Sequence, residues 1–92
     1  CFGCNFVNHL LAVAQDLLRE TPLSLSDMRP LIEETISKAM ASDDPATLQT
    51  GPAIRHDEST LQRHQALLKE DPRLTAIYQL MTHSIQERAE KP

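Results

Sequence analysis

Several residue types on which other kinds of protein depend are scarce in this sequence. Its 92 residues include no Trp, one Tyr, two Phe and only two Gly. The core must therefore be built from aliphatic side chains, and the chain has no glycine-rich loop of the kind that cradles a nucleotide phosphate. No stretch alternates polar and apolar residues over a useful length, so we expect no β-strand.

Clustered positive charge is also missing. The net charge is −4, and the nine Lys and Arg residues are scattered along the chain. This distribution argues against a nucleic-acid groove and against an anionic membrane surface as partners. No apolar run approaches the ~18 residues that span a bilayer, and no charged leader opens the chain, so we expect a cytoplasmic protein. Because the first residue is Cys1 rather than Met, we interpret the chain as a fragment or an excised domain.

What the sequence does contain is helical periodicity. From residue 5 to about residue 20, apolar residues form two adjacent stripes that together cover an arc of about 160°. An ordinary surface helix buries a stripe of about 100°, and a domain of this length has only a thin core. We therefore expect this helix to pack on more than one neighbour, one of them a second copy of the chain in a homodimer.

A second helix is expected to follow. Ser24 or Ser26 can cap it, Pro30 is tolerated in its first turn, and it runs to about Ser42. The apolar residues expected on its inner face are Leu31, Ile32, Ile36, Ala39 and Met40.

Aspartate and proline residues place the remaining helices. Pro45 begins a short segment that reaches Gln49. Asp57 is expected to cap a third long helix that ends near residue 70. Asp71, followed by Pro72, is expected to cap a last helix that ends near residue 87. We expect an all-α fold, a compact bundle of about four longer helices and a short one. The expected inner residues are Leu61, Leu67 and Leu68 in the third helix, and Leu74, Ile77, Tyr78, Leu80, Met81 and Ile85 in the last.

Cys1 and Cys4 have the spacing of a thiol redox pair. The redox fold requires a strand and a βαβ context, which this sequence lacks. A zinc site would need two further ligands, and the histidines show no second paired spacing. We therefore expect two free thiols and no metal site. The four histidines are His9, His56, His64 and His83.

Histidine also raises the possibility of acid–base catalysis. His64 projects between Leu67 and Leu68 on the expected inner side of its helix. The interpretation we favour is a packed, hydrogen-bonded side chain. His83 lies opposite the apolar arc of the last helix, and we expect it to be exposed to solvent.

Asn5, Asn8 and His9 project within about 100° of one another, on the face of the first helix opposite its apolar stripes. They form a polar cluster near the expected start of that helix. Free N–H groups and the positive end of the helix dipole favour an anionic or carbonyl-bearing ligand there. The alternative is the solvated face of an amphipathic helix, and the residues alone leave both interpretations open.

Three segments and one further residue resemble one protein family: residues 5–11, residues 31–35, residues 50–57 and His64. The family comprises bacterial Rossmann-like proteins of the NADP oxidoreductase type, whose C-terminal helical domain is of unknown function and is similar to phosphogluconate dehydrogenase C-terminal domains. The resemblance implies that residues 1–92 form this single helical C-terminal domain. It also implies an N-terminal dinucleotide-binding Rossmann domain outside this chain, no cofactor in the chain itself, and NADP(H) in the intact protein.

The resemblance extends to a candidate site. Hydroxyacid dehydrogenases of this superfamily carry Lys-x-x-Asn-Asn on the equivalent helix, where Lys is the acid–base group and Asn orients the substrate. Here the pattern falls on residues 5–9, with Asn5 in the Lys position. Asn does not exchange a proton at neutral pH. His9 can replace the Lys as the acid, with Asn5 and Asn8 holding a carbonyl.

The implied function is that of a substrate-cleft and dimerisation domain of an NADP-dependent oxidoreductase, inactive alone. The alternative is a non-catalytic dimerisation or sensing module of a nucleotide-binding protein. A second motif is expected to form an ordered turn with a mainly structural role, in which Arg55 binds an acidic group within the domain or on the missing one. The residues of this motif are Thr50, Gly51, Pro52, Arg55, Asp57 and His64.

Overall fold

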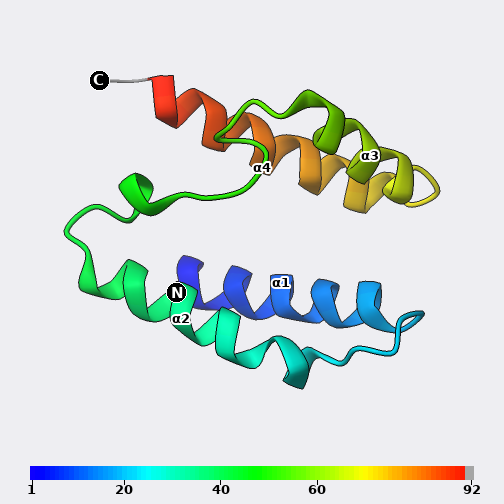
Figure 1. Cartoon of the computed structure of the whole chain (residues 1–92), viewed down its shortest axis with the longest axis horizontal. Coiled ribbons are helices and arrows are strands. Elements are labelled where there is room, and N and C mark those ends of the chain that lie inside the picture. The colour runs from blue at the N-terminus through cyan, green and yellow to red at the C-terminus, as the bar shows by residue number, and fades with distance from the viewer. Residues whose placement is uncertain (91–92) are drawn as a thin grey trace. The chain divides into compact units, whose positions relative to one another are not determined.

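The computed structural model describes residues 1–90, and it contains no strand within them. Four α-helices and two short 3-10 helices follow one another along the chain (Figure 1). The prediction of an all-α fold is confirmed. The chain divides into two compact units, Cys1–Ala41 and Ser42–Pro92. The elements are α1 (Phe2–Leu18), η1 (Leu25–Met28), α2 (Arg29–Ala41), η2 (Pro45–Leu48), α3 (Glu58–Leu68) and α4 (Pro72–Glu90).

In the first unit, α1 begins earlier than its apolar stripes indicated. The N–H of Asn5 donates to the Cys1 carbonyl at 3.0 Å, which already closes a helical turn. The rings of Phe2 and Phe6, one turn apart, meet edge to face with their centroids 4.5 Å apart. Such i, i+4 pairs stabilise a helix end. The helix ends at Leu18, whose carbonyl accepts the hydroxyl of Thr21 at 2.7 Å.

Of the two serines proposed as caps, Ser24 fulfils the role. It forms a capping box with Asp27, whose Oδ2 accepts the Ser24 N–H at 2.8 Å. The box begins η1 rather than α2, and the chain then continues directly into α2 at Arg29. Pro30 therefore lies in the first turn of α2, as predicted.

Most of the predicted inner face of α2 is exposed. Leu31, Ile36 and Met40 are all exposed, Met40 to 81%, whereas Ile32 and Ala39 are half-buried. The prediction of those three as inner residues is wrong for this chain. The chain runs from η1 directly into α2, and the described residues leave these three side chains uncovered.

In the second unit, α3 and α4 pack against each other. Asp71 connects them and caps α4 as predicted, because its Oδ1 accepts the N–H groups of Arg73 and Leu74 at 3.1 Å each. A hydrogen bond from Gln79 Nε2 to Gln65 Oε1, 3.0 Å long, joins the two helices. None of the helices among residues 1–90 has the length and apolar character needed to cross a bilayer.

The inner stripe of α3 is narrower than expected. Leu61 is only 3% exposed, and Leu68 is half-buried, but Leu67 is 82% exposed. In α4, Leu80 and Met81 are likewise exposed, and the buried position between its half-buried apolar residues is Thr82. The inward assignments of Leu67, Leu80 and Met81 are therefore wrong. Each helix has one helical neighbour in its unit, so it buries one stripe rather than a broad arc.

Candidate functional site

The polar cluster on α1 lies in solvent. The side chains of Asn5, Asn8 and His9 are exposed, and they make no hydrogen bond to any residue in the described range 1–90. Because α1 begins at Phe2, Asn5 already donates its N–H to Cys1. The free N–H groups of the helix end therefore precede the cluster, and the dipole effect fades beyond the first turn. A ligand here would be held by side-chain amides and the imidazole.

The opposite, apolar side of α1 is also incompletely covered. Phe6, Leu10 and Leu17 are exposed, Leu17 to 52%, whereas Leu11 and Leu18 are half-buried. No residue of α1 is fully buried. This helix therefore presents both a polar face and an apolar face to whatever surrounds it.

The second motif forms a tight turn before α3. The N–H of Asp57 donates to the Pro52 carbonyl at 2.9 Å, and the N–H of His56 donates to the Ala53 carbonyl at 3.2 Å. These two bonds form the Schellman arrangement that closes a helical turn, with the residue before Asp57 in the left-handed conformation. Gly51 has φ 101° and His56 has φ 52°. The prediction of an ordered turn is consistent with this geometry.

The turn is anchored to α4 at a buried point. Ala53 is buried, and its carbonyl also accepts Gln86 Nε2 at 3.3 Å. Leu61 of α3 is the other buried apolar residue among the described residues of this unit. The backbone of the motif is therefore fixed by the fold, whereas the side chain of Arg55 extends into solvent.

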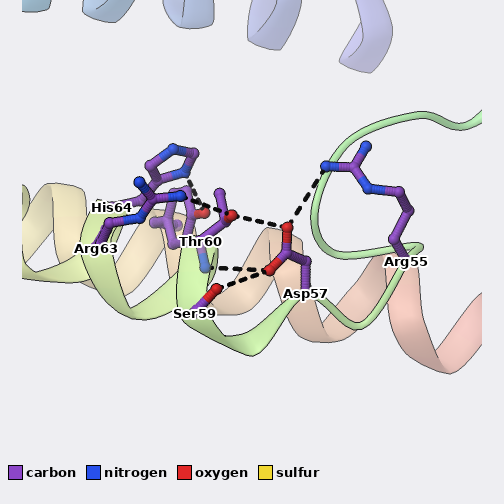
Figure 2. A network of polar contacts seen from close by, with 7 residues as sticks. Arg55, Asp57, Ser59, Thr60, Arg63 and His64 are labelled. Atoms are coloured by element: carbon purple, nitrogen blue, oxygen red, sulfur yellow. Dashed lines mark hydrogen bonds and ion pairs between the residues drawn. The ribbon is translucent and has the colours of Figure 1, made fainter.

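Asp57 is the N-cap of α3, as the sequence predicted. Its Oδ1 accepts the Thr60 N–H at 3.3 Å and the Ser59 hydroxyl at 3.1 Å, and its Oδ2 accepts the Thr60 hydroxyl at 2.7 Å (Figure 2). The two bonds from Thr60 contribute most to a pKa of Asp57 below its usual value, with smaller contributions from Ser59 and Arg55. The carboxylate is thus held in its charged form.

Two arginines flank this carboxylate. Arg55 Nη2 lies 3.8 Å from Asp57 Oδ2, and Arg63 Nη2 donates to Thr60 Oγ1 at 3.1 Å. In Figure 2 the Arg55 side chain lies on one side of Asp57, and the Arg63 side chain lies on the other side, beyond Thr60. The sequence analysis identified Arg55 but missed Arg63 and Thr60. The positions of these two after an Asp cap, on the third and sixth residues of α3, were the available signal.

His64 is packed and hydrogen-bonded, as predicted. Its Nδ1 lies 2.7 Å from the Tyr78 hydroxyl, and the two rings meet edge to face with centroids 5.7 Å apart. Burial raises the pKa of Tyr78. The pair joins α3 to α4, so its geometry serves packing. His83 is exposed, also as predicted.

Cys1 and Cys4 are both free and exposed. Within residues 1–90, no group of His, Cys, Asp and Glu side chains is arranged to hold a metal ion. Two polar features of the described residues are candidate sites: the cluster on α1 and the network around Asp57.

Within residues 1–90 the structure contains helices and no nucleotide-binding sheet. The chain belongs to the family DUF2520, a domain of unknown function, whose model matches residues 1–85. A crystal structure from Bacteroides fragilis, described as that of a candidate NADP oxidoreductase, is 44% identical and has a TM-score of 0.86. The similarity covers 94% of this chain and 33% of that one, so this chain spans about a third of its length. No curated protein matches the sequence.

Proposed function

We propose that this chain is the C-terminal helical domain of a two-domain NADP-dependent oxidoreductase. The observation that carries the proposal is the 44% identity to a structure described as an NADP oxidoreductase candidate, over 94% of this chain but only 33% of the other. The remaining length of that protein leaves room for a Rossmann domain. Single domains most often have about 100 to 150 residues.

The residues of this chain do not fit a dinucleotide. A phosphate cradle requires a strand, a glycine-rich turn and a following helix, and residues 1–90 contain no strand. The two glycines are isolated: Gly3 lies inside α1, and Gly51 lies between Thr50 and Pro52. NADP(H) is therefore assigned to the N-terminal domain outside this chain, and this domain alone is inactive.

In the intact protein, this domain contributes to substrate binding through the polar face of α1. Asn5 and Asn8 carry amide groups that can donate hydrogen bonds to a carbonyl oxygen, and His9 can hold a proton at its imidazole. All three are exposed and lack partners within residues 1–90. Side chains that the domain leaves unpaired are available to a substrate in a cleft shared with the N-terminal domain.

The apolar face of α1 is assigned to a homodimer. Phe6, Leu10 and Leu17 lie on one side of α1 and form a continuous apolar stripe, yet all three are exposed. Large exposed apolar surfaces on soluble domains mark sites of association. A second copy of the chain, packed on the same face by two-fold symmetry, covers it without requiring another gene product.

A non-catalytic dimerisation or sensing module is the second candidate. One observation favours it: Asn5 occupies the position at which the superfamily pattern has its acid–base Lys. His9 must then supply the proton for turnover to occur. The two candidates differ in whether the intact protein oxidises NADPH.

The decisive experiment measures NADPH oxidation by the intact protein with a panel of carbonyl and imine substrates. We expect turnover, and we expect Asn8→Ala and His9→Ala to lower kcat/KM by about 10- to 100-fold, because each removes a hydrogen bond to the reacting group. Gln15→Ala, on the same helix and also exposed, serves as the control and should retain full activity. Tight NADPH binding without turnover on any substrate would favour the sensing module.

A further inference from the structure

Arg55 and Arg63 have hydrogen-bond donors that the fold does not use. Arg55 lies 3.8 Å from the nearest Asp57 oxygen and makes no hydrogen bond within residues 1–90. Arg63 donates one bond, to Thr60 Oγ1 at 3.1 Å, and forms no ion pair in the same range. A guanidinium group carries five N–H donors. Most donors of both side chains therefore face solvent.

The neighbouring carboxylates do not satisfy these arginines. Asp57 already accepts three bonds from Ser59 and Thr60, two of them on Oδ1, so Oδ1 has no acceptor site left for a bidentate pair with Arg55. Glu58 is exposed and forms no ion pair with either arginine in the described part of the chain. The Asp57 carboxylate instead orders the start of α3, between the two cations.

The link between the two guanidinium groups is short. It runs from Arg63 to Thr60 (3.1 Å), from Thr60 to Asp57 (2.7 Å) and from Asp57 to Arg55 (3.8 Å), and Figure 2 shows the guanidinium groups at its two ends. Asp57 and Thr60 are both half-buried, whereas the two Arg side chains are exposed. The centre of the arrangement is fixed, and its cationic ends are free to close on a ligand.

We infer that Arg55 and Arg63 form a binding site for a small oxyanion, the phosphate or carboxylate group of a small molecule. Guanidinium groups bind such groups through parallel N–H donors, which gives both strength and geometry. The site concerns the second unit alone, and it does not depend on whether the parent protein is an oxidoreductase.

The test is an NMR titration of the 92-residue chain that follows the Nε–Hε signals of its arginines. Inorganic phosphate and acetate are added separately, each at constant ionic strength with chloride. We expect saturable shifts for Arg55 and Arg63, and none for Arg73, an exposed arginine of α4. Tighter binding of phosphate identifies a phosphate group as the ligand, and tighter binding of acetate identifies a carboxylate; both support the site.

Charge-matched variants separate a site from a general ionic effect. Arg55→Gln and Arg63→Gln should each weaken binding of the preferred anion about tenfold, and Arg73→Gln should leave it unchanged. Asp57→Asn keeps a good N-cap but removes the negative charge between the arginines, so it should tighten binding severalfold. Linear shifts of equal size on all arginines, or equal effects of the three Gln variants, would overturn the inference.

Discussion

The two units of the chain hold themselves together in different ways. In the unit Ser42–Pro92, side-chain hydrogen bonds join α3 to α4 and α4 to the turn before α3. In the unit Cys1–Ala41, every side-chain hydrogen bond among the described residues spans four positions or fewer. Its helices are thus formed by local interactions, with little connecting one to the other.

Burial follows the same division. All three buried residues, Ala53, Leu61 and Thr82, belong to the second unit, and the first unit has none among its described positions. Local hydrogen bonds and caps specify helices, but stability comes from apolar surface removed from water. The second unit therefore contains its own small core. The first unit instead leaves exposed the apolar side chains that would otherwise form a core.

The largest expected effect is the loss of that core. Leu61→Ala removes a side chain that is 3% exposed, whereas Leu67→Ala, on the same helix, removes one that is 82% exposed. We expect Leu61→Ala to lower the free energy of unfolding by about 3 kcal/mol, and Leu67→Ala to change it by less than about 0.5 kcal/mol. Urea unfolding followed by circular dichroism measures both. Similar losses of unfolding free energy in the two variants would show that α3 does not pack through the face that carries Leu61.

The next effect concerns association through the first unit. Leu17→Lys places a charge on the exposed apolar side of α1, and we expect it to weaken the proposed dimer by at least about tenfold, because a charge cannot be buried there without a partner. Gln15→Lys adds the same charge at another exposed position of α1 and should leave the dimer intact. Light scattering over a range of concentrations gives the dissociation constants. A wild-type chain that stays monomeric throughout would contradict the dimer proposal.

Local features of the fold were predictable from the sequence, whereas the burial of individual side chains was predictable only in part. The caps Asp57 and Asp71, together with Pro45 at the start of η2, depend on neighbouring residues only, and each was predicted. Which leucines are inside depends on the elements that pack on a helix. Leu67 and Met40 have the spacing of residues on the buried face of a helix, but no part of their own unit covers them.

The candidate sites show the same limit. The Asp57 end of the second network could be predicted, because an Asp before a helix attracts its first N–H groups. For Arg63 the sequence offered only its position on α3, because the contact itself depends on the rotamer that brings its guanidinium to Thr60. The left-handed conformation of His56 was also not predicted: it is uncommon for any residue other than glycine, although His adopts it more often than most.

A smaller effect is expected from the cap of α3, and it depends on pH. The pKa of Asp57 is lowered in the folded state, so this group stabilises the fold above its unfolded pKa of about 3.9 and loses that contribution as the pH falls through the lower folded pKa. Asp57→Ala should lower the melting midpoint by about 5 °C near neutral pH. Thermal melts at a series of pH values should show the difference between the wild type and the variant shrinking as the pH falls below the unfolded pKa of about 3.9. A difference that is constant down to low pH would mean that the charge of Asp57 does not contribute.

The smallest expected effect is an increase in stability. It distinguishes the strained turn before α3 from the regular helices of the second unit. His56 has φ 52°, a left-handed conformation that costs a residue with a Cβ about 1–2 kcal/mol, whereas glycine adopts it freely. Since glycine also loses more entropy on folding, we expect His56→Gly to raise the free energy of unfolding by about 0.5 kcal/mol. His83→Gly, at an exposed position inside α4, should lower it by about 0.3–0.5 kcal/mol. Urea titrations of both variants decide the matter, because a loss of stability at both positions would mean that the imidazole of His56 contributes more than its backbone strain costs.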